Sequence, residues 1–576
     1  MASIQPKNVK GYKYWQIVSS QRVNGKPRPI VLEHLGTADS LLKRLKNRNK
    51  ISVKSYSHGL IAAILKISQT LNIVSIINKH VKSQRKYFTD TLKRHNLTVG
   101  SYILFIALGR ICEPTSKLGW LKWATKTSLS FLLKINISKI ESQDFWDTMD
   151  CIPEDKIDDI GFDILEEIKS KYNIKTDTLF YDTTNFFTYI ATTNKQCTIA
   201  QRGKNKQKRT DLRQFGLAMT VSKEDYIPIF HDVYEGNKND SPVFKENIDK
   251  LESRLTRLKM KKENHTIVFD RGCNSKKNLE YIEDDKRLFY VGALSPCYHE
   301  SLIEDADGNY ETIKVNNSNL SIYRDKREIW GKERTVIVFV SEKLKAGQVR
   351  EIYKIINKIK KQLDELQDSL DNPRGKKYVR KELIEKIDGI IYNKKIEDSF
   401  SYTLTKKRNQ PYKIEYKVDE NEIENIKEDL GFRIIMTNRH NWNSHDIIKA
   451  YYGQSVVEHA FKNLKNPFHL SLRPNFHWTD QKIRVHAFAC VLGYTLTMLL
   501  WKTVKEKCKY KGNLDNLLDD LNEVRLATIL ERDKNKPNVK YQLEELDEKE
   551  LGFMKALECL NIHERKLKLK GISVYK

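Results

Sequence analysis

The feature that most constrains the fold of this 576-residue chain is a change of hydrophobic periodicity near residue 176. From about residue 57 up to that point apolar residues recur at helical spacing, whereas from 177 to 294 short β-prone segments alternate with helical ones. The segments follow the order β-β-β-α-β-α-β, with strands at 177–182, 215–221, 226–234, 265–270 and 287–294, one helix with Pro242 at its first position, and one helix at 274–285. This order predicts an α/β fold with a mixed sheet, in which three antiparallel strands lead into a parallel extension and helices flank the sheet.

Six regions are expected along the chain. A β-hairpin element (1–56) turning at Asn24-Gly25 precedes a helical domain (57–175), which is expected to dock the binding partner. The sheet domain is divided into 176–295 and 441–506 by an α/β insertion (296–440), which contains extended segments and a helix with heptad spacing from Ile352 to Leu370. That helix is expected to pair antiparallel with the helix after Asn372-Pro373. The tail (507–576) is expected to form surface helices.

Two aspartates end two of the predicted strands. Asp182 closes "DTLFYD" and Asp270 closes "HTIVFD", 88 residues later. In a mixed sheet of this order the two strands can be neighbours with their carboxyl ends at one edge, where α/β sheets bind ligands. Two carboxylates at that edge would suit Mg²⁺ or Mn²⁺. Alternatively, each aspartate is only a turn-forming residue at the end of a strand.

A helix expected at 451–466 carries a third candidate acid. Its apolar residues lie on one side at i, i+3, i+4, i+7 spacing: Val457, Ala460, Phe461 and Leu464. A second stripe beside them holds four polar side chains: Tyr451, Gln454, Glu458 and Lys465. This stripe is either the solvated face of an amphipathic helix or part of a binding site.

Charge and cysteine usage point to a cytoplasmic protein that acts on nucleic acid. Lys and Arg number 102 against 75 Asp and Glu, and a net charge of +27 favours a polyanionic partner, although membrane surfaces and ribosomes also attract basic proteins. The eight cysteines have neither zinc-type nor CxxC spacing. The apolar segment 485–501 is short for a membrane span and is expected to be a buried core helix.

With these residues in place, the chain resembles the DDE transposases of prokaryotic insertion sequences, which have an RNase H-like catalytic domain. "YDTTNFF" resembles the first-Asp motif and "VFDRGCNS" the second. The Tyr-x2-Arg-x3-Glu-x6-Lys signature of a large subgroup matches Tyr451, Glu458 and Lys465, but Gln454 stands at the arginine position. This departure puts an arginine–phosphate contact in doubt. The resemblance spans most of the chain, including the insertion before the last glutamate.

The resemblance implies that Asp182, Asp270 and Glu458 are catalytic and hold two Mg²⁺ ions, with Mn²⁺ able to substitute. Two such ions cleave phosphodiesters by activating the attacking oxygen and stabilising the leaving oxygen. The implied substrates are double-stranded DNA at terminal inverted repeats and target DNA. A homodimer on DNA and a nucleoid-associated, cytoplasmic location without membrane attachment are also implied.

Further DNA contacts are expected around these acids. Tyr451, Gln454, Lys465 and Arg271 are candidates for phosphate contacts. The loop from Lys195 to Arg213 holds seven cations against one acid and is either a backbone clamp or a solvated loop: Lys195, Arg202, Lys204, Lys206, Lys208, Arg209 and Arg213. Trp330 is the candidate for stacking on a flipped base, with Trp442 and Trp478 as rivals.

Two other functions remain open on the sequence. A protein that binds specific DNA without catalysis would keep the basic surplus but not need three acids. A nuclease of the RNase H-like class would cut without a specific terminal sequence and would not join strands.

Overall fold

The computed structural model describes residues 2–564 except 24–25, 47–50, 82–92, 96, 206, 261–264, 287, 316–317, 376, 394, 409 and 533–536. The chain divides into two compact units. The first comprises 1–160, 466–474 and 488–576, and the second comprises 161–465 and 475–487.

The first unit contains helices packed around a buried core and two small sheets of three strands. Its helices are α1 Ala38–Lys46, α2 Gly59–Thr70, α3 Ile73–Lys79, α4 Val99–Cys112, α5 Lys117–Ala124, α6 Leu129–Leu133, α7 Ser142–Asp150, α18 Leu514–Glu523 and α19 Glu548–Ala556. Its strands are β1 Ala2–Val9, β2 Tyr12–Val23, β3 Lys26–Thr37, β4 Ile51–Ser57, β5 Lys93–Arg94, β6 Leu97–Thr98, β18 Arg525–Arg532 and β19 Pro537–Leu543.

The N-terminal hairpin is confirmed, because β2 pairs antiparallel with β3; its expected turn at 24–25 lies outside the described residues. A further strand, β1, pairs with β2. The expected helical tail contains α18 and α19, but the expectation was wrong for the segment between them, which forms two strands. β18 and β19 form a hairpin, and β18 also pairs with β4, which lies more than 450 residues earlier in the chain. Pairing with so distant a strand leaves no signal in the local sequence.

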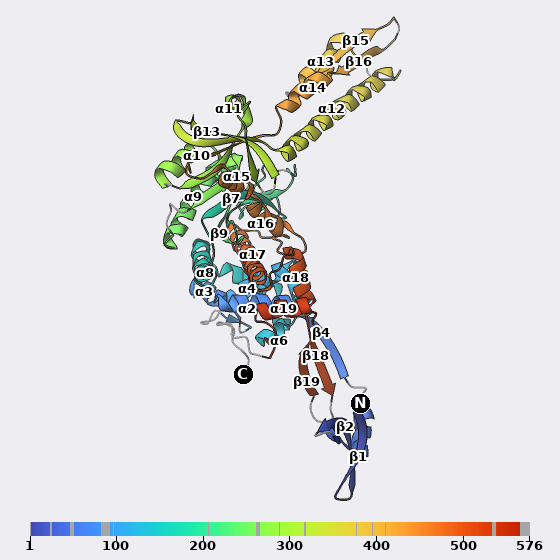
Figure 1. Cartoon of the computed structure of the whole chain (residues 1–576). Coiled ribbons are helices and arrows are strands. Elements are labelled where there is room, and N and C mark those ends of the chain that lie inside the picture. Colours follow the sequence, from blue (N-terminus) through green and yellow to red (C-terminus); the bar gives the residue numbers. More distant parts are fainter. Residues whose placement is uncertain are drawn as a thin grey trace. The chain divides into compact units, whose positions relative to one another are not determined.

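The second unit is built on a nine-stranded mixed sheet in the order β12-β13-β14-β17-β11-β10-β7-β8-β9. Figure 1 labels β7, β9 and β13 of this sheet. Its strands are β7 Thr178–Thr188, β8 Arg213–Ser222, β9 Pro228–Glu235, β10 Thr266–Phe269, β11 Phe289–Leu294, β12 Glu311–Val315, β13 Ser318–Ile329, β14 Lys332–Val340 and β17 Phe432–Thr437. Its helices outside the insertion module are α8 Ile157–Lys171, α9 Asp240–Arg257, α10 Lys276–Glu280, α11 Glu300–Ala306, α15 Ser444–Tyr452 and α16 Ser455–Lys465.

The predicted strand order is confirmed in this sheet. β7, β8 and β9 are antiparallel, and β7, β10 and β11 are parallel. α9 begins at Asp240, so Pro242 is its third residue and not its first as predicted. The extended segments assigned to the insertion, β13 and β14, extend this same sheet, because β14 pairs with β17. The large mixed sheet flanked by helices confirms the α/β class.

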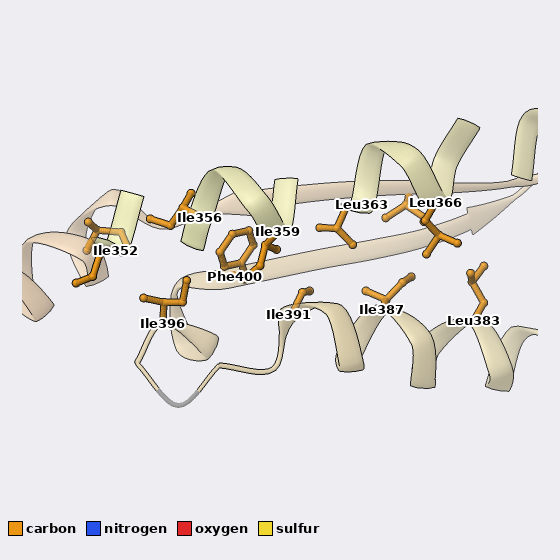
Figure 2. Packing of buried hydrophobic residues seen from close by; sticks show 12 residues of the cluster. Ile352, Ile356, Ile359, Leu363, Leu366, Leu383, Ile387, Ile391, Ile396 and Phe400 are labelled. Carbon is orange, nitrogen blue, oxygen red and sulfur yellow. The ribbon is translucent and has the colours of Figure 1, made fainter. Parts of the chain in front are cut away.

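The separately packed part of the insertion is a module between β14 and β17. It consists of α12 Glu342–Asp371, α13 Arg380–Ile391, β15 Phe400–Lys406, β16 Tyr412–Val418 and α14 Glu420–Glu428. Figure 2 shows its core, where the heptad residues of α12 face α13 and β15: Ile352, Ile356, Ile359, Leu363 and Leu366 against Leu383, Ile387, Ile391 and Phe400. The predicted helix pair is therefore confirmed.

One helix, α17 Asp480–Cys508, begins in the second unit and continues in the first. By length and composition it could cross a membrane, and the bent pair α2–α3 passes the same test. However, 94% of the apolar window of α17 is buried inside the structure, as in the core helix of a soluble protein. This agrees with the buried core helix expected at 485–501.

Candidate active site

Asp182 and Asp270 lie at the same level on neighbouring parallel strands. The register pairs Phe269 of β10 with Tyr181 of β7, so the next residue of each chain segment is the aspartate. Asp182 is partly exposed and Asp270 is exposed. The strand register thus brings the two acids to one edge of the sheet, as expected. Figure 1 shows where β7 lies among the helices of this unit.

The two faces of β7 have different roles. Tyr181 points toward α9, where its hydroxyl accepts a hydrogen bond from Asn247 Nδ2 at 3.1 Å and its ring packs on Phe244. Because side chains alternate along a strand, Phe180, Asp182 and Thr184 share the opposite face. On that side α16 packs against β7 and β8, so Asp182 lies on the face that α16 covers.

The helix predicted at 451–466 is broken, and this is a correction. α15 ends at Tyr452 and α16 starts at Ser455, with Gly453 and Gln454 between them. Gly453 lies directly on Phe180: a Cβ added there would be 2.3 Å from Cζ of that ring. The polar stripe predicted on one helix is therefore shared between two helices, with Tyr451 on the first and Glu458 and Lys465 on the second.

Two contacts fix α16 along β7. Gly453, just before α16, lies over Phe180, and Lys465, its last residue, donates from Nζ to Thr184 Oγ1. Glu458 lies between these contacts along α16, as Asp182 lies between Phe180 and Thr184 along β7. Glu458 also precedes Lys465 by about two turns, which places both on the same side of the helix. Glu458 is exposed, and Lys465 is partly buried.

Tyr451 lies close to Asp270 and to an arginine that the sequence analysis missed. Burial raises the pKa of Tyr451; the charge of Asp270 acts in the same direction, and Arg433 opposes it. Arg433 of β17 donates from Nη1 to the Tyr451 hydroxyl at 3.0 Å. A guanidinium therefore stands near the site although Gln454 occupies the position where the family signature has arginine. Nothing in the local sequence "GFRIIMTN" distinguishes Arg433 from other strand residues.

Gln454 itself has an unusual environment. Its Nε2 is buried and, among the residues that the structure describes, has no hydrogen-bond partner. A buried amide N–H without a partner is costly, by about 1–3 kcal/mol. Such a donor, at the turn between α15 and α16, is suited to donate a hydrogen bond to an oxygen atom of a ligand.

The carboxylates fit a hard divalent cation in chemistry but do not form a closed site. One oxygen each of Asp182 and Asp270 accepts a 2.7 Å hydrogen bond from the following backbone N–H, of Thr183 and Arg271 respectively. Oxygen donors at a partly exposed edge are what Mg²⁺ prefers. Within the described parts of the chain, however, no three His, Cys, Asp or Glu side chains are close enough together to hold a metal ion. The register brings the two aspartates together, whereas Glu458 does not complete a cluster with them.

The basic loop divides into cations bound within the loop and cations that face solvent. Arg213 donates to the carbonyls of Asn194 and Thr192, both at 3.0 Å, so it holds the loop. Arg209 forms a two-pronged ion pair with Asp211 at 2.7 Å. Four further cations are exposed: Lys195, Arg202, Lys204 and Lys208. Lys206 lies outside the described residues. Arg271, beside Asp270, is also exposed.

Trp330 lies far from the two aspartates. It forms the turn between β13 and β14 with φ of +50°, followed by Gly331 at +81°. The strand register relates the two positions. Thr335 of β14 pairs with Thr437 of β17, which pairs with Val291 of β11, and Val291 pairs with Val268 of β10. Asp270 follows Val268 toward one edge of the sheet, whereas Trp330 precedes Thr335 by five residues toward the other edge. The candidate base-stacking residue is therefore at the opposite edge of the sheet.

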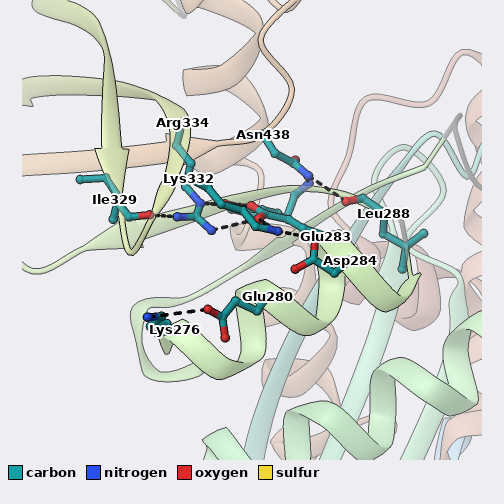
Figure 3. A network of polar contacts seen from close by, with 10 residues as sticks. Lys276, Glu280, Glu283, Asp284, Leu288, Ile329, Lys332, Arg334 and Asn438 are labelled. Atoms are coloured by element: carbon teal, nitrogen blue, oxygen red, sulfur yellow. Dashed lines mark hydrogen bonds and ion pairs between the residues drawn. The ribbon is translucent and has the colours of Figure 1, made fainter.

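A buried polar network fixes that opposite edge (Figure 3). Arg334 is fully buried and donates to both carboxylate oxygens of Glu283, at 3.1 and 3.0 Å, and to the carbonyl of Ile329 next to Trp330. Asn438 donates to the carbonyl of Leu288, just before β11. Trp442, four residues later than Asn438, also follows β17 at this edge. Trp478 instead lies in the loop before α17 and is 46% exposed.

Comparisons with known proteins identify the family of this chain. The family model described as "Transposase DDE domain" matches residues 188–496, and "IS1634 family transposase, N-terminal domain" matches residues 3–56. The first match begins six residues after Asp182 and includes Asp270 and Glu458. No curated protein matches the chain. One solved structure that resembles it is a cryo-EM piggyBac transposase synaptic complex with hairpin DNA, 9% identical over 81% of this chain and 79% of that one, with a TM-score of 0.37. Because the DDE model covers more than half of the 576 residues, this chain belongs to the DDE transposases of insertion sequences.

Proposed function

We propose that the protein cuts DNA at the ends of its own insertion sequence and joins those ends to target DNA, through an RNase H-like core that holds divalent ions. The observation that carries the proposal is the register of β7 and β10, which puts Asp182 and Asp270 side by side, with Asp182 on the strand that the Glu458 helix covers. The strand order of three antiparallel strands followed by two parallel ones supports the RNase H-like core.

In this proposal Asp182, Asp270 and Glu458 hold Mg²⁺ ions, or Mn²⁺ in their place. When bound, two such ions would activate the attacking water or 3′-hydroxyl and stabilise the leaving oxygen. Asp182, which is level with Asp270 and on the strand that α16 covers, is the natural shared ligand. Since Glu458 is exposed and does not complete a cluster with the aspartates, we infer that its side chain changes rotamer toward Asp182 in the complex with DNA.

The surrounding side chains would position the DNA backbone. Lys465 and the Arg433–Tyr451 pair lie on the α16 side of the sheet and can contact phosphates beside the cleaved bond. Gln454 offers a buried N–H donor, and Arg271 is exposed next to Asp270. The exposed lysines of the 195–213 loop, with Lys206, would bind phosphates farther along.

We propose that double-stranded DNA is the partner, as terminal repeats and as target, and that a homodimer holds two ends together. The helical domain at 57–175 is the proposed docking part. A cytoplasmic, nucleoid-associated location follows from that partner.

Cleavage of a labelled DNA fragment carrying the element's terminus tests the proposal. Asp182→Asn, Asp270→Asn and Glu458→Gln should each abolish cleavage and joining in Mg²⁺ while a gel shift with the same fragment is retained. Asp307→Asn and Glu428→Gln, at exposed acids outside the site, are the matched controls and should cut normally. Normal cutting by all three site variants would refute the assigned residues.

One observation favours a second function, a DNA-binding protein without catalysis. It is the failure of the three acids to gather among the described residues. In that case the wild-type protein would bind the terminal fragment in a gel shift, but it would not nick the fragment in either Mg²⁺ or Mn²⁺. A nuclease without strand transfer would instead cut fragments of unrelated sequence equally well and yield no joined product.

A further inference from the structure

Three aromatic side chains lie exposed at the far end of β7. Tyr189, Phe476 and Trp478 are 51%, 49% and 46% exposed. The rings of Tyr189 and Phe476 lie against each other, with centroids 6.0 Å apart and planes tilted by 48°. Exposed aromatic residues that gather in one place commonly mark a binding surface. We call these three residues the aromatic patch.

The aromatic patch rests on a fixed base. Along 475–478 the residues alternate, with Asn475 and His477 buried and Phe476 and Trp478 exposed. The ring of His477 stacks on that of His486 of α17, at 4.0 Å between centroids. Because the buried neighbours anchor this segment, Phe476 and Trp478 are held pointing toward solvent.

Hydrogen bonds join this segment to the chain that follows β7. Tyr189 N donates to the carbonyl of Asn475 at 3.1 Å, and Asn194 Nδ2 donates to the carbonyl of Trp478 at 3.1 Å. One carboxylate oxygen of Asp480 accepts from the backbone N–H groups of Thr198 and Ile199, at 2.7 and 3.0 Å. The aromatic patch therefore combines two chain segments, almost 290 residues apart, into one surface.

Positive charge borders the aromatic patch. Arg213 of the basic loop donates from Nη1 to the carbonyl of Asn194, whose side chain is bonded to Trp478, so a loop arginine lies next to the segment that holds the patch. Lys482 Nζ lies 5.4 Å from the centroid of the Trp478 ring. The exposed cations of the 195–213 loop follow directly in sequence from the segment that the patch is bonded to. Aromatic faces beside cations match the bases and phosphates of a nucleic acid strand.

The position relative to the candidate active site is fixed by β7. This strand is paired with β8 from Leu179 as far as Thr188, which pairs with Arg213. Tyr189 follows at once and is seven residues beyond Asp182, or about 23 Å along an extended strand. A nucleic acid strand that leaves the two aspartates in this direction reaches the aromatic patch after a few nucleotides.

We propose that the aromatic patch binds unpaired nucleotides of single-stranded DNA, with the exposed cations of the 195–213 loop on its phosphates. Bases within a duplex already stack on each other, so their faces are closed to these side chains, whereas unpaired bases can stack on Tyr189, Phe476 and Trp478. The proposal deepens the proposed function by naming the ligand next to the active site, and it rests on that function for its biological setting only. Binding of single strands does not require the three acids.

Fluorescence anisotropy with a labelled 12-nucleotide thymidine strand and a labelled duplex of the same length tests the proposal. Trp478→Ala and Phe476→Ala should each weaken single-strand binding by about 5- to 150-fold and leave duplex binding within about twofold. Trp478→Phe should restore most of the affinity, and replacement of the central thymidines by abasic sites should weaken binding to the wild type. Tyr298→Ala removes an aromatic side chain of the same unit that is 82% exposed and is the matched control.

The proposal is overturned if Trp478→Ala and Phe476→Ala bind the single strand as Tyr298→Ala does, or if they lose duplex affinity equally. Thermal melting of each variant shows whether it is folded, and because the substituted side chains are half exposed the melting temperatures should equal that of the wild type. Asp182→Asn should retain full single-strand binding. If the catalytic residues are wrongly assigned, the single-strand binding results therefore stay the same. If the aromatic patch does not bind single strands, the effects of Asp182→Asn, Asp270→Asn and Glu458→Gln on cleavage stay the same.

Discussion

Substituting Gly453 with alanine tests how closely the break between α15 and α16 is fitted to β7. The added Cβ would lie 2.3 Å from Cζ and 2.9 Å from Cε1 of Phe180, and 3.1 Å from the carbonyl oxygen of Ala450. Carbon atoms in contact are about 3.5–4.0 Å apart, so the turn and the ring must separate by more than about 1 Å. The φ of Gly453 is −67°, which alanine adopts freely, so the cost comes from packing alone.

We expect Gly453→Ala to destabilise the second unit by about 1–3 kcal/mol, the usual cost of forcing extra carbon into a packed site. Because Glu458 lies five residues further on, the same displacement should move it relative to Asp182 and lower DNA cleavage by about 100-fold, as misplacements of about 1 Å do. Amide hydrogen exchange in β7 and α16 measures the stability of this unit by itself, and cleavage of the terminal fragment measures activity.

Gly389→Ala is the control, since a Cβ at Gly389 in α13 meets nothing within 4 Å. It should be neutral or stabilise the insertion module by about 0.5–1 kcal/mol. The double variant Gly453→Ala, Phe180→Leu should be less destabilised than the sum of its single variants, because the shorter side chain removes the atoms that clash. If Gly453→Ala is as stable and as active as Gly389→Ala, the close packing of the turn on β7 is refuted.

Two further predictions concern buried polar groups. Arg334→Met should destabilise β14 by about 1–3 kcal/mol in hydrogen-exchange measurements, because Glu283 loses the buried guanidinium that donates to both of its oxygens and keeps only Lys332 and the Tyr290 hydroxyl. Adding Glu283→Gln should recover most of the loss, and an unchanged loss would contradict the pairing. Burial lowers the pKa of His58 from 6.5 to about 3, and His563 acts in the same direction. The unfolded chain binds this proton below pH 6.5 and the folded chain does not, so the stability of the first unit should fall as pH decreases from 6.5 toward 3, and thermal melts of His58→Gln should show a smaller fall.

Much of the sheet was predictable because its signals are local. The strands of the second unit alternate or are continuously apolar, and turn residues separate them, so their order followed from the sequence. The heptad residues of α12 similarly indicated their own partner helix. The position of Asp182 and Asp270 beside each other then follows from the strand order, because neighbouring parallel strands end at the same edge of the sheet.

The features that escaped prediction depend on contacts between distant residues. The break at Gly453 is set by the ring of Phe180, more than 270 residues earlier, while the local pattern continues a helix across it. Pairing of β14 with β17 draws the insertion's strands into the main sheet and carries Trp330 to the wrong edge for the proposed base contact. Arg433 gains its role only because α15 brings Tyr451 to it.

The place where the insertion module joins the sheet has an evolutionary consequence. The chain leaves β14 at Val340 and returns in β17 at Phe432, and these two residues are direct strand partners, with Ser341 N bonded to the carbonyl of Gly431 at 2.8 Å. The two ends of the module are therefore separated only by the distance between neighbouring strands. A tight turn of a few residues could span the same distance. Any folded segment with adjacent termini can be exchanged at this point while the strands on either side stay paired. Lineages of such enzymes can therefore exchange the module as one cassette, while the strands that carry Asp182 and Asp270 keep their register.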